Sequence, residues 1–278
     1  GYMKKIILSV FTFLFMASAS YAATWVAADR VSEVGATLIS KNNLPAKTTF
    51  KVVNGTADNS NTSKTNVIQI SSTDLSYTGN DSEVAAVIAH EMGYIINGTY
   101  SKNIMREAAK DALTSNLSSG NIIATAANSE FLANKASAAD EQDADITGVD
   151  LMIKTGYNPL AMIVVITKMP GSVWEALFGK PANTDRAMNV FNYLTYNYPS
   201  KVKAGYGCQE YRAFLEYANP IVEKRNASKS KLEKFNKEQE KNKAERAKNI
   251  SQYKATGGLS GWDASYTILQ QLTGSSER

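Results

Sequence analysis

Residues 82–94 read Ser-Glu-Val-Ala-Ala-Val-Ile-Ala-His-Glu-Met-Gly-Tyr, and this stretch decides the fold. Asn80 can cap a helix here while Glu83 reaches back from three residues later, the pattern of a capping box. The apolar residues of the stretch share an inward face, and Gly98 is a suitable stop. We therefore predict a capped helix over residues 81–97 that carries His90 and Glu91.

His90 is the only histidine in the chain. In the H-E-x-x-H pattern, two histidines one helical turn apart bind one zinc ion, and the glutamate activates the metal-bound water as general base. The pattern's last position is Tyr94 here, so only its first half is present. Without further support, a single histidine on a helix is more often structural.

A second acidic segment gives that support. Glu141 and Asp145 lie four residues apart on a helix predicted over residues 137–154, which ends at Gly156. They therefore share one face of that helix. This spacing suits Glu141 as a third zinc ligand, with Asp145 accepting the far N–H of the ligating His90.

Together these motifs resemble the zinc metallopeptidase family of HtpX, BepA, the mitochondrial Oma-type proteases and the CaaX prenyl protease, within the zincin clan. The β-rich run 66–71 precedes stretch 82–93, which is similar to the family's active-site helix. Segment 141–148 resembles its third-ligand helix, and segment 156–159 resembles the turn that ends it. The resemblance covers residues 25–200 and implies an α+β, zincin-like fold, mostly helical with a small β-sheet. Strands are expected at 49–53 and 66–71.

The resemblance also implies functional residues. Zinc would be bound by His90, residue 94 and Glu141, with Glu91 as general base if the site is active. Lys180-Pro181, followed by Arg186, falls where the family often has His-Pro and a downstream Arg, close to the catalytic centre.

The departures from the family pattern concern the metal. A catalytic zinc needs three protein ligands and an open water position. Tyr94 can bind metal only as phenolate, whose reference pKa is about 10, and a Lys180 ammonium would add unfavourable charge beside a cation. Without metal, converging carboxylates need a positive partner. We predict a degenerate zinc site in which a cation from the 180–186 loop, Lys180 or Arg186, stands in for zinc.

The two ends of the chain differ from its middle. Residues 3–23 have the charged start, short apolar run and small residues of a signal peptide cleaved after Ala22, which predicts a periplasmic or secreted protein without a transmembrane span. Segment 220–255 holds eleven Lys/Arg against five Glu. The basic charge thus comes from the ends, and a nucleic-acid role is poorly supported. We expect a metallopeptidase-like domain over 23–219 and a charged helical arm over 220–278, solvated and with a short amphipathic end.

Three functions stay open. The first is an exported pseudo-peptidase that binds an extended peptide or an envelope protein partner, with run 66–71 as the edge strand of its groove. The second is an active but atypical zinc endopeptidase in envelope proteolysis or quality control, with Tyr94, Asp140 or Asp145 completing the ligands. The third is an adaptor that works through the arm 221–278.

Overall fold

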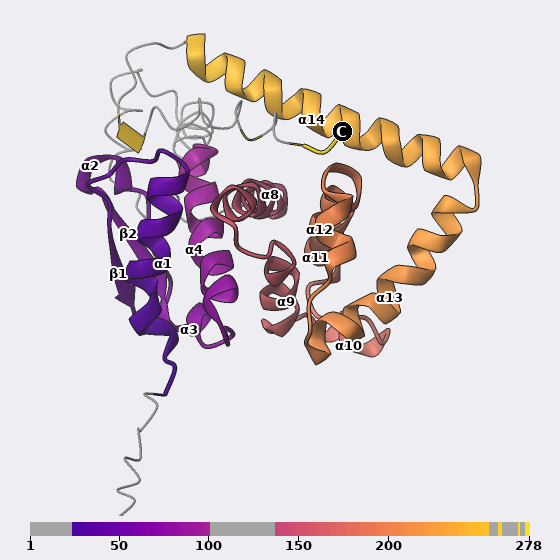
Figure 1. Cartoon of the computed structure of the whole chain (residues 1–278), viewed down its shortest axis with the longest axis horizontal. Coiled ribbons are helices and arrows are strands. Elements are labelled where there is room, and N and C mark those ends of the chain that lie inside the picture. The colour runs from indigo at the N-terminus through magenta and orange to yellow at the C-terminus, as the bar shows by residue number, and fades with distance from the viewer. Residues whose placement is uncertain (1–23, 101–136, 256–260, 263–271, 273–275) are drawn as a thin grey trace, which may run out of the picture.

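The protein is described by a computed structural model over residues 24–100, 137–255, 261–262, 272 and 276–278 (Figure 1). The expected signal peptide lies outside these residues. So does segment 101–136, whose Ala-, Ser- and Asn-rich sequence favours two helices of small residues. The described part is mostly helical with one small parallel sheet, which confirms the α+β fold class. Within that part, no helix is both long enough and apolar enough to cross a membrane.

The N-terminal third forms the sheet and its cover. Helix α1 (Ala27–Lys41) packs on strand β1 (Thr49–Val53), which pairs in parallel with β2 (Val67–Ser71). The connection between the strands includes the short helix α2 (Thr62–Thr65), and helix α3 (Ser72–Leu75) follows β2 directly. The connection is not simply solvated, because Asn59 and Thr62 within it are buried.

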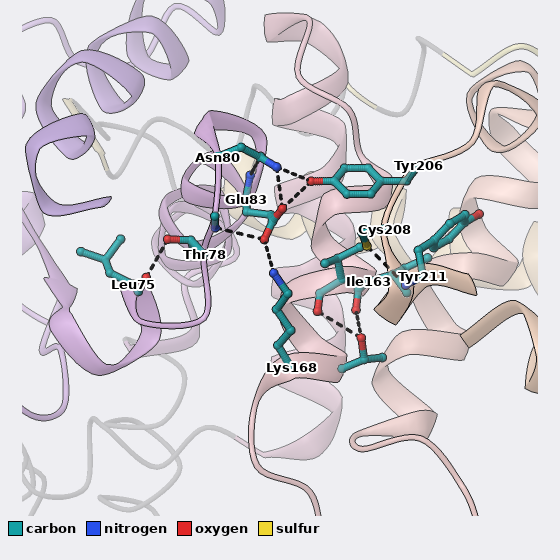
Figure 2. A network of polar contacts seen from close by, with 12 residues as sticks. Leu75, Thr78, Asn80, Glu83, Ile163, Lys168, Tyr206, Cys208 and Tyr211 are labelled. Atoms are coloured by element: carbon teal, nitrogen blue, oxygen red, sulfur yellow. Dashed lines mark hydrogen bonds and ion pairs between the residues drawn. The ribbon is translucent and has the colours of Figure 1, made fainter. Parts of the chain in front are cut away.

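Helix α4 (Asp81–Ile96) is the stretch from which the fold was predicted, and it is almost entirely buried. The Asn80 side chain accepts a hydrogen bond from the Glu83 backbone N–H at 3.0 Å, which confirms the predicted cap. The Glu83 carboxylate accepts bonds from the Asn80 amide at 2.6 Å and from the Lys168 ammonium and the Tyr206 hydroxyl (Figure 2). This buried carboxylate therefore fixes the start of α4 to two later segments of the chain.

Helix α8 (Ala138–Thr155) crosses α4 at very close range. A Cβ atom added at Gly93 of α4 would meet the carbonyl oxygen of Ala144 at 2.4 Å, and one at Gly148 of α8 would meet the backbone of Ala89 at 3.1 Å. Glycine at these two points lets the helix backbones touch. The helix ends at Gly156, whose φ of 92° is the left-handed cap expected from the sequence.

Four helices complete the body of the domain. Helix α9 (Leu160–Lys168), which is strongly apolar in sequence, is buried along almost its whole length. Helix α10 (Val173–Leu177) buries none of its residues, and α11 (Thr184–Asn197) returns to pack on α8 and α9. Helix α12 (Pro199–Ala204) then leads to the C-terminal helices.

The predicted arm, 220–278, takes in the end of α13 (Gln209–Asn226) and the long α14 (Lys229–Ala255). Helix α13 continues through Pro220, so the change of composition there is not a helix boundary. The expectation of a solvated arm is wrong at Arg246 of α14, whose guanidinium donates to the buried Asp150 carboxylate at 3.1 Å. Beyond α14, Trp262 and Leu272 are buried, in line with an amphipathic end that docks back on the core.

Candidate functional site

The centre of the site is a contact between α4 and α8. His90 of α4 donates its Nδ1–H to Asp145 of α8 at 2.7 Å, and the Asp145 side chain is fully buried. Burial opposes a charged imidazole, but attraction to Asp145 and this hydrogen bond outweigh it, so the pKa of His90 lies above its usual value. Burial likewise opposes the Asp145 charge, and His90 with Arg186 overcomes it, so the pKa of Asp145 is lowered.

Arg186 enters from the first turns of α11 and joins two carboxylates. Its Nε and Nη2 donate to the two oxygens of Asp145 at 3.0 and 2.9 Å, the bidentate geometry of a strong pair. Its Nη1 lies 3.0 Å from Glu141 Oε1. Arg186 is thus a positive partner for both Asp145 and Glu141.

Tyr94 occupies the helical position of the second ligand histidine. Its ring meets the His90 ring edge-on, with centroids 4.6 Å apart and planes at 81°. Burial, followed by the nearby charges of Glu141 and Glu91, raises the pKa of Tyr94 far above its usual range. The side chain is therefore a neutral phenol near neutral pH, which is a poor metal ligand.

Glu91 is held by a residue that the sequence analysis did not single out. The Asn59 amide donates to Glu91 Oε2 at 2.8 Å, and both side chains are buried. Burial raises the pKa of Glu91 above its usual value. Asn59 lies in a polar connection with no motif around it, so no local signal in the sequence could have revealed its role.

Asn59 also occupies the outward edge of β2. Its side chain accepts from the Gln69 backbone N–H at 2.7 Å and donates to the Gln69 carbonyl at 3.0 Å, as a paired strand would. The Thr62 hydroxyl donates to the Val67 carbonyl on the same edge at 2.9 Å. The outward backbone groups of Val67 and Gln69 are thus used within the chain.

Two hollows flank the site. One, of about 110 Å³, has an apolar wall from α4 and α9 that includes Val87, Met162 and Val165, and a charged end at His90 and Arg186. The other, of about 300 Å³, is lined by Glu91 and by the segments before α2 and after β2. Asp74 lines both, and burial raises the pKa of its carboxyl group.

Two other residues named from the sequence lie elsewhere. Lys180 is exposed on the turn after α10, where its backbone N–H donates to the Glu175 carbonyl at 2.9 Å. Asp140 closes the N-terminal capping box of α8 with Ser137. Of the 180–186 loop, the structure brings Arg186 to the carboxylates.

The family model described as Peptidase family M48 matches residues 26–227 of the chain. The chain belongs to peptidase family M48. This confirms the family inferred from the sequence, whose members are typically zinc-dependent. No curated protein and no solved structure matches the chain significantly.

The donor set of this M48 chain does not fit a catalytic zinc ion. His90 and Glu141 are ordinary ligand types, but Glu141 is paired with Arg186 and Tyr94 is a neutral phenol. Asp145, a possible replacement ligand, already serves His90 and Arg186 through both oxygens. Across the residues that the structure describes, no three His, Cys, Asp or Glu side chains are grouped to hold a metal ion.

Proposed function

We propose that this M48 protein is an exported, non-catalytic pseudo-peptidase that binds an extended peptide or an envelope partner protein in its former active-site cleft. The observation that carries this proposal is the buried, neutral Tyr94 phenol at the position of the second zinc ligand. A catalytic zinc needs three protein ligands, and this substitution leaves two ordinary ones.

The charge arrangement supports the same conclusion. Arg186 neutralises Glu141 and Asp145 together with His90, whose pKa is raised. A divalent cation at this place would lie close to the Arg186 guanidinium, and like charges at short range are unfavourable. This arrangement supports a site that is folded without metal.

The cleft offers a specific way to hold a peptide. The hollow of about 110 Å³ is large enough for one apolar side chain against α4 and α9, next to the Arg186 guanidinium. Pairing of a peptide strand with the edge of β2 is the less favoured binding mode. The Asn59 side chain already bonds to the Gln69 backbone and would have to be displaced. The occupant we propose is thus anchored by a side chain more than by backbone pairing.

Zinc stoichiometry of the purified protein tests this proposal. We expect wild type to hold far less than one zinc per chain after mild dialysis, and Tyr94→His to take up zinc, because the third ligand is restored. Tyr94→Phe is the matched control, since it changes the hydroxyl without adding a ligand. Stoichiometric zinc in wild type would sink the proposal.

A second candidate is an active but atypical zinc endopeptidase in envelope proteolysis. The bond of 2.7 Å from His90 Nδ1 to Asp145 favours it, because zinc-bound histidines are oriented in this way by a carboxylate. Peptide cleavage that is abolished by Glu91→Gln would establish this function. Cleavage that survives Glu91→Gln comes from another mechanism or a contaminant.

A further inference from the structure

Helix α10 carries an exposed apolar surface that the proposed cleft does not use. Its four large apolar positions, Val173, Trp174, Leu177 and Phe178, are 67–74% exposed. The other large apolar side chains that are exposed in the described part of the chain reach only 36–46%. Clusters of this kind on a monomer usually mark a place of interaction.

The base of this surface is firmly built. Ser172 and Glu175 form a capping box at the start of α10, and the Glu175 carboxylate also accepts the Thr184 backbone N–H at 3.1 Å. The Asn183 amide donates to the Met169 carbonyl at 3.2 Å, which joins the two ends of the segment. The exposure is therefore a property of a fixed turn and not of a frayed end.

The charges around α10 suit a phosphate-rich surface. Segment 169–183 contains two charged residues, Glu175 and Lys180. The Glu175 carboxylate is turned inward onto backbone N–H groups, whereas Lys180 is exposed directly after the apolar residues. Lysine beside an apolar surface places its ammonium among lipid phosphates while its stem stays in the apolar layer.

The small size of the α10 surface favours a lipid layer over a second protein as its partner. Val173 and Leu177 form one row at i, i+4 spacing, and Trp174 and the C-cap residue Phe178 form the next, so the apolar residues share one broad face. Their exposed area is on the order of 500 Å², given 150–250 Å² for each aromatic side chain. A standard stable interface buries about 800 Å² on each partner, more than this helix offers a second copy.

We propose that α10 is a membrane-contact site whose apolar residues enter the interfacial layer of a lipid bilayer, with Lys180 at the headgroup phosphates. Tryptophan and phenylalanine are typical of such interfacial contacts. Figure 1 places α10 at the end of the molecule opposite α14, and α1 begins at the same end as α10. Trp25 and Val26, just before α1, are exposed as well.

Trp174 reports on this contact directly. The full chain is mixed with phosphatidylcholine vesicles, with and without phosphatidylglycerol, and its emission is recorded with brominated acyl chains as quenchers. The experiment uses a Trp25→Phe background, because Trp25 is exposed and follows the apolar run 6–17. We expect a blue shift and quenching that adding Trp174→Phe removes, since the remaining Trp262 is buried. This local readout is needed because the apolar run 6–17 can bind vesicles by itself.

Matched variants show which residues contribute to vesicle binding. In the chain processed after Ala22, which lacks the apolar run 6–17, Trp174→Ala combined with Phe178→Ala should lower vesicle partitioning about tenfold, because the two aromatic side chains supply most of the contact area of α10. Lys180→Glu should weaken binding to the vesicles that contain phosphatidylglycerol more than to neutral ones. Ile221→Ala, an exposed apolar control on α13, should leave partitioning unchanged.

Two results would overturn the proposal. One is Trp174 emission that is neither shifted nor quenched on either vesicle. The other is a wild-type dimer in light scattering that the double variant turns into a monomer, which would assign α10 to contact with a second copy. Neither measurement depends on zinc binding. The membrane-contact proposal is therefore tested separately from the pseudo-peptidase proposal.

Discussion

Two buried aspartates on α8, five residues apart, are compensated in different ways. Asp145 and Asp150 are both at most 1% exposed, and each receives an arginine from a later helix. Asp145 faces two cationic side chains, Arg186 and His90, and its pKa is lowered. Asp150 faces one cation, Arg246, together with the Tyr193 hydroxyl at 2.6 Å, and burial raises its pKa.

Burial opposes the charge of both carboxylates, and the pKa is lowered where two basic side chains face the aspartate but raised where one does. The Asp145 pair lies at the candidate metal site, whereas the Asp150 pair connects α14 to α8. Two buried Arg–Asp pairs on one helix thus make different connections, and each pair can be removed by its own substitution.

The largest effect is expected from Arg186→Met. It leaves Asp145 and Glu141 without their shared cation, and breaking a buried pair on one side costs about 3–5 kcal/mol. Urea unfolding measures the loss. Arg186→Lys keeps the charge but not the bidentate geometry, so its free energy of unfolding should lie between those of wild type and Arg186→Met. The prediction is contradicted if Arg186→Met lowers the free energy of unfolding by no more than the loss of an exposed ion pair does. Asp145 would then not depend on Arg186 as a buried carboxylate should.

Arg246→Met should cost less, about 2–3 kcal/mol, because Asp150 can take up a proton and become a neutral hydrogen-bonding group. The folded-state pKa of Asp150 lies above its unfolded value, so its ionisation lowers stability as pH rises through the folded pKa. Removing Arg246 raises that pKa further.

The Arg246→Met loss should therefore be greater at about pH 8 than at about pH 5, as followed by urea unfolding at both values. The contribution of Asp145 to stability depends on pH in the opposite direction. Its lowered pKa contributes stability above the unfolded value of 3.8, and that stability is lost as pH falls through the folded pKa. Equal losses for Arg246→Met at the two pH values would remove the distinction between the two aspartates.

Gly93→Ala tests whether the two regions are mechanically separate. The new Cβ would meet the Ala144 carbonyl oxygen at 2.4 Å, next to Asp145, and overpacking costs about 1–3 kcal/mol. The imidazole NMR signals of His90 should shift, while the tyrosine signals around Asp150 should not. Gly79→Ala is a suitable control, because an added Cβ there has its nearest neighbour at 3.8 Å. Shifts at both regions would show that α8 moves as one body.

The smallest effect is expected from Asp81→Asn, which breaks a half-exposed pair with Arg30. Solvent screens such pairs, so they contribute little to stability. The Arg30 hydrogen bond lowers the pKa of Asp81, so the contribution is present near neutral pH and lost as pH falls below 3.8. Thermal unfolding at neutral and acid pH measures it. A loss as large as that of Arg246→Met would mean that burial adds nothing to the two pairs on α8.

Much of the fold follows from local sequence. The capped helix at Asn80 and the helix that stops at Gly156 both appear where the sequence placed them. These signals are local, since a cap or a left-handed glycine acts within a few residues. The parallel pairing of β1 with β2 was not stated in advance, because pairing depends on contacts between distant segments.

Only part of the candidate site could be predicted from the sequence. His90, Glu141, Asp145 and Arg186 were named from motifs, and the structure brings these four together. Lys180 was named with them and lies on the exposed turn after α10. Asn59 could not be found, because its bond to Glu91 depends on how a connection folds back over β2.

The sequence by itself determined the family, the capped helix and the replacement of a ligand histidine by Tyr94, because these are properties of residue type and spacing. The tertiary structure decided which cation meets the carboxylates, that Asn59 closes the β2 edge and that Arg246 fastens α14. It also decided that the apolar residues of α10 face outward. Each of these depends on segments far apart in the chain, whose meeting is fixed by packing and burial and not by local pattern.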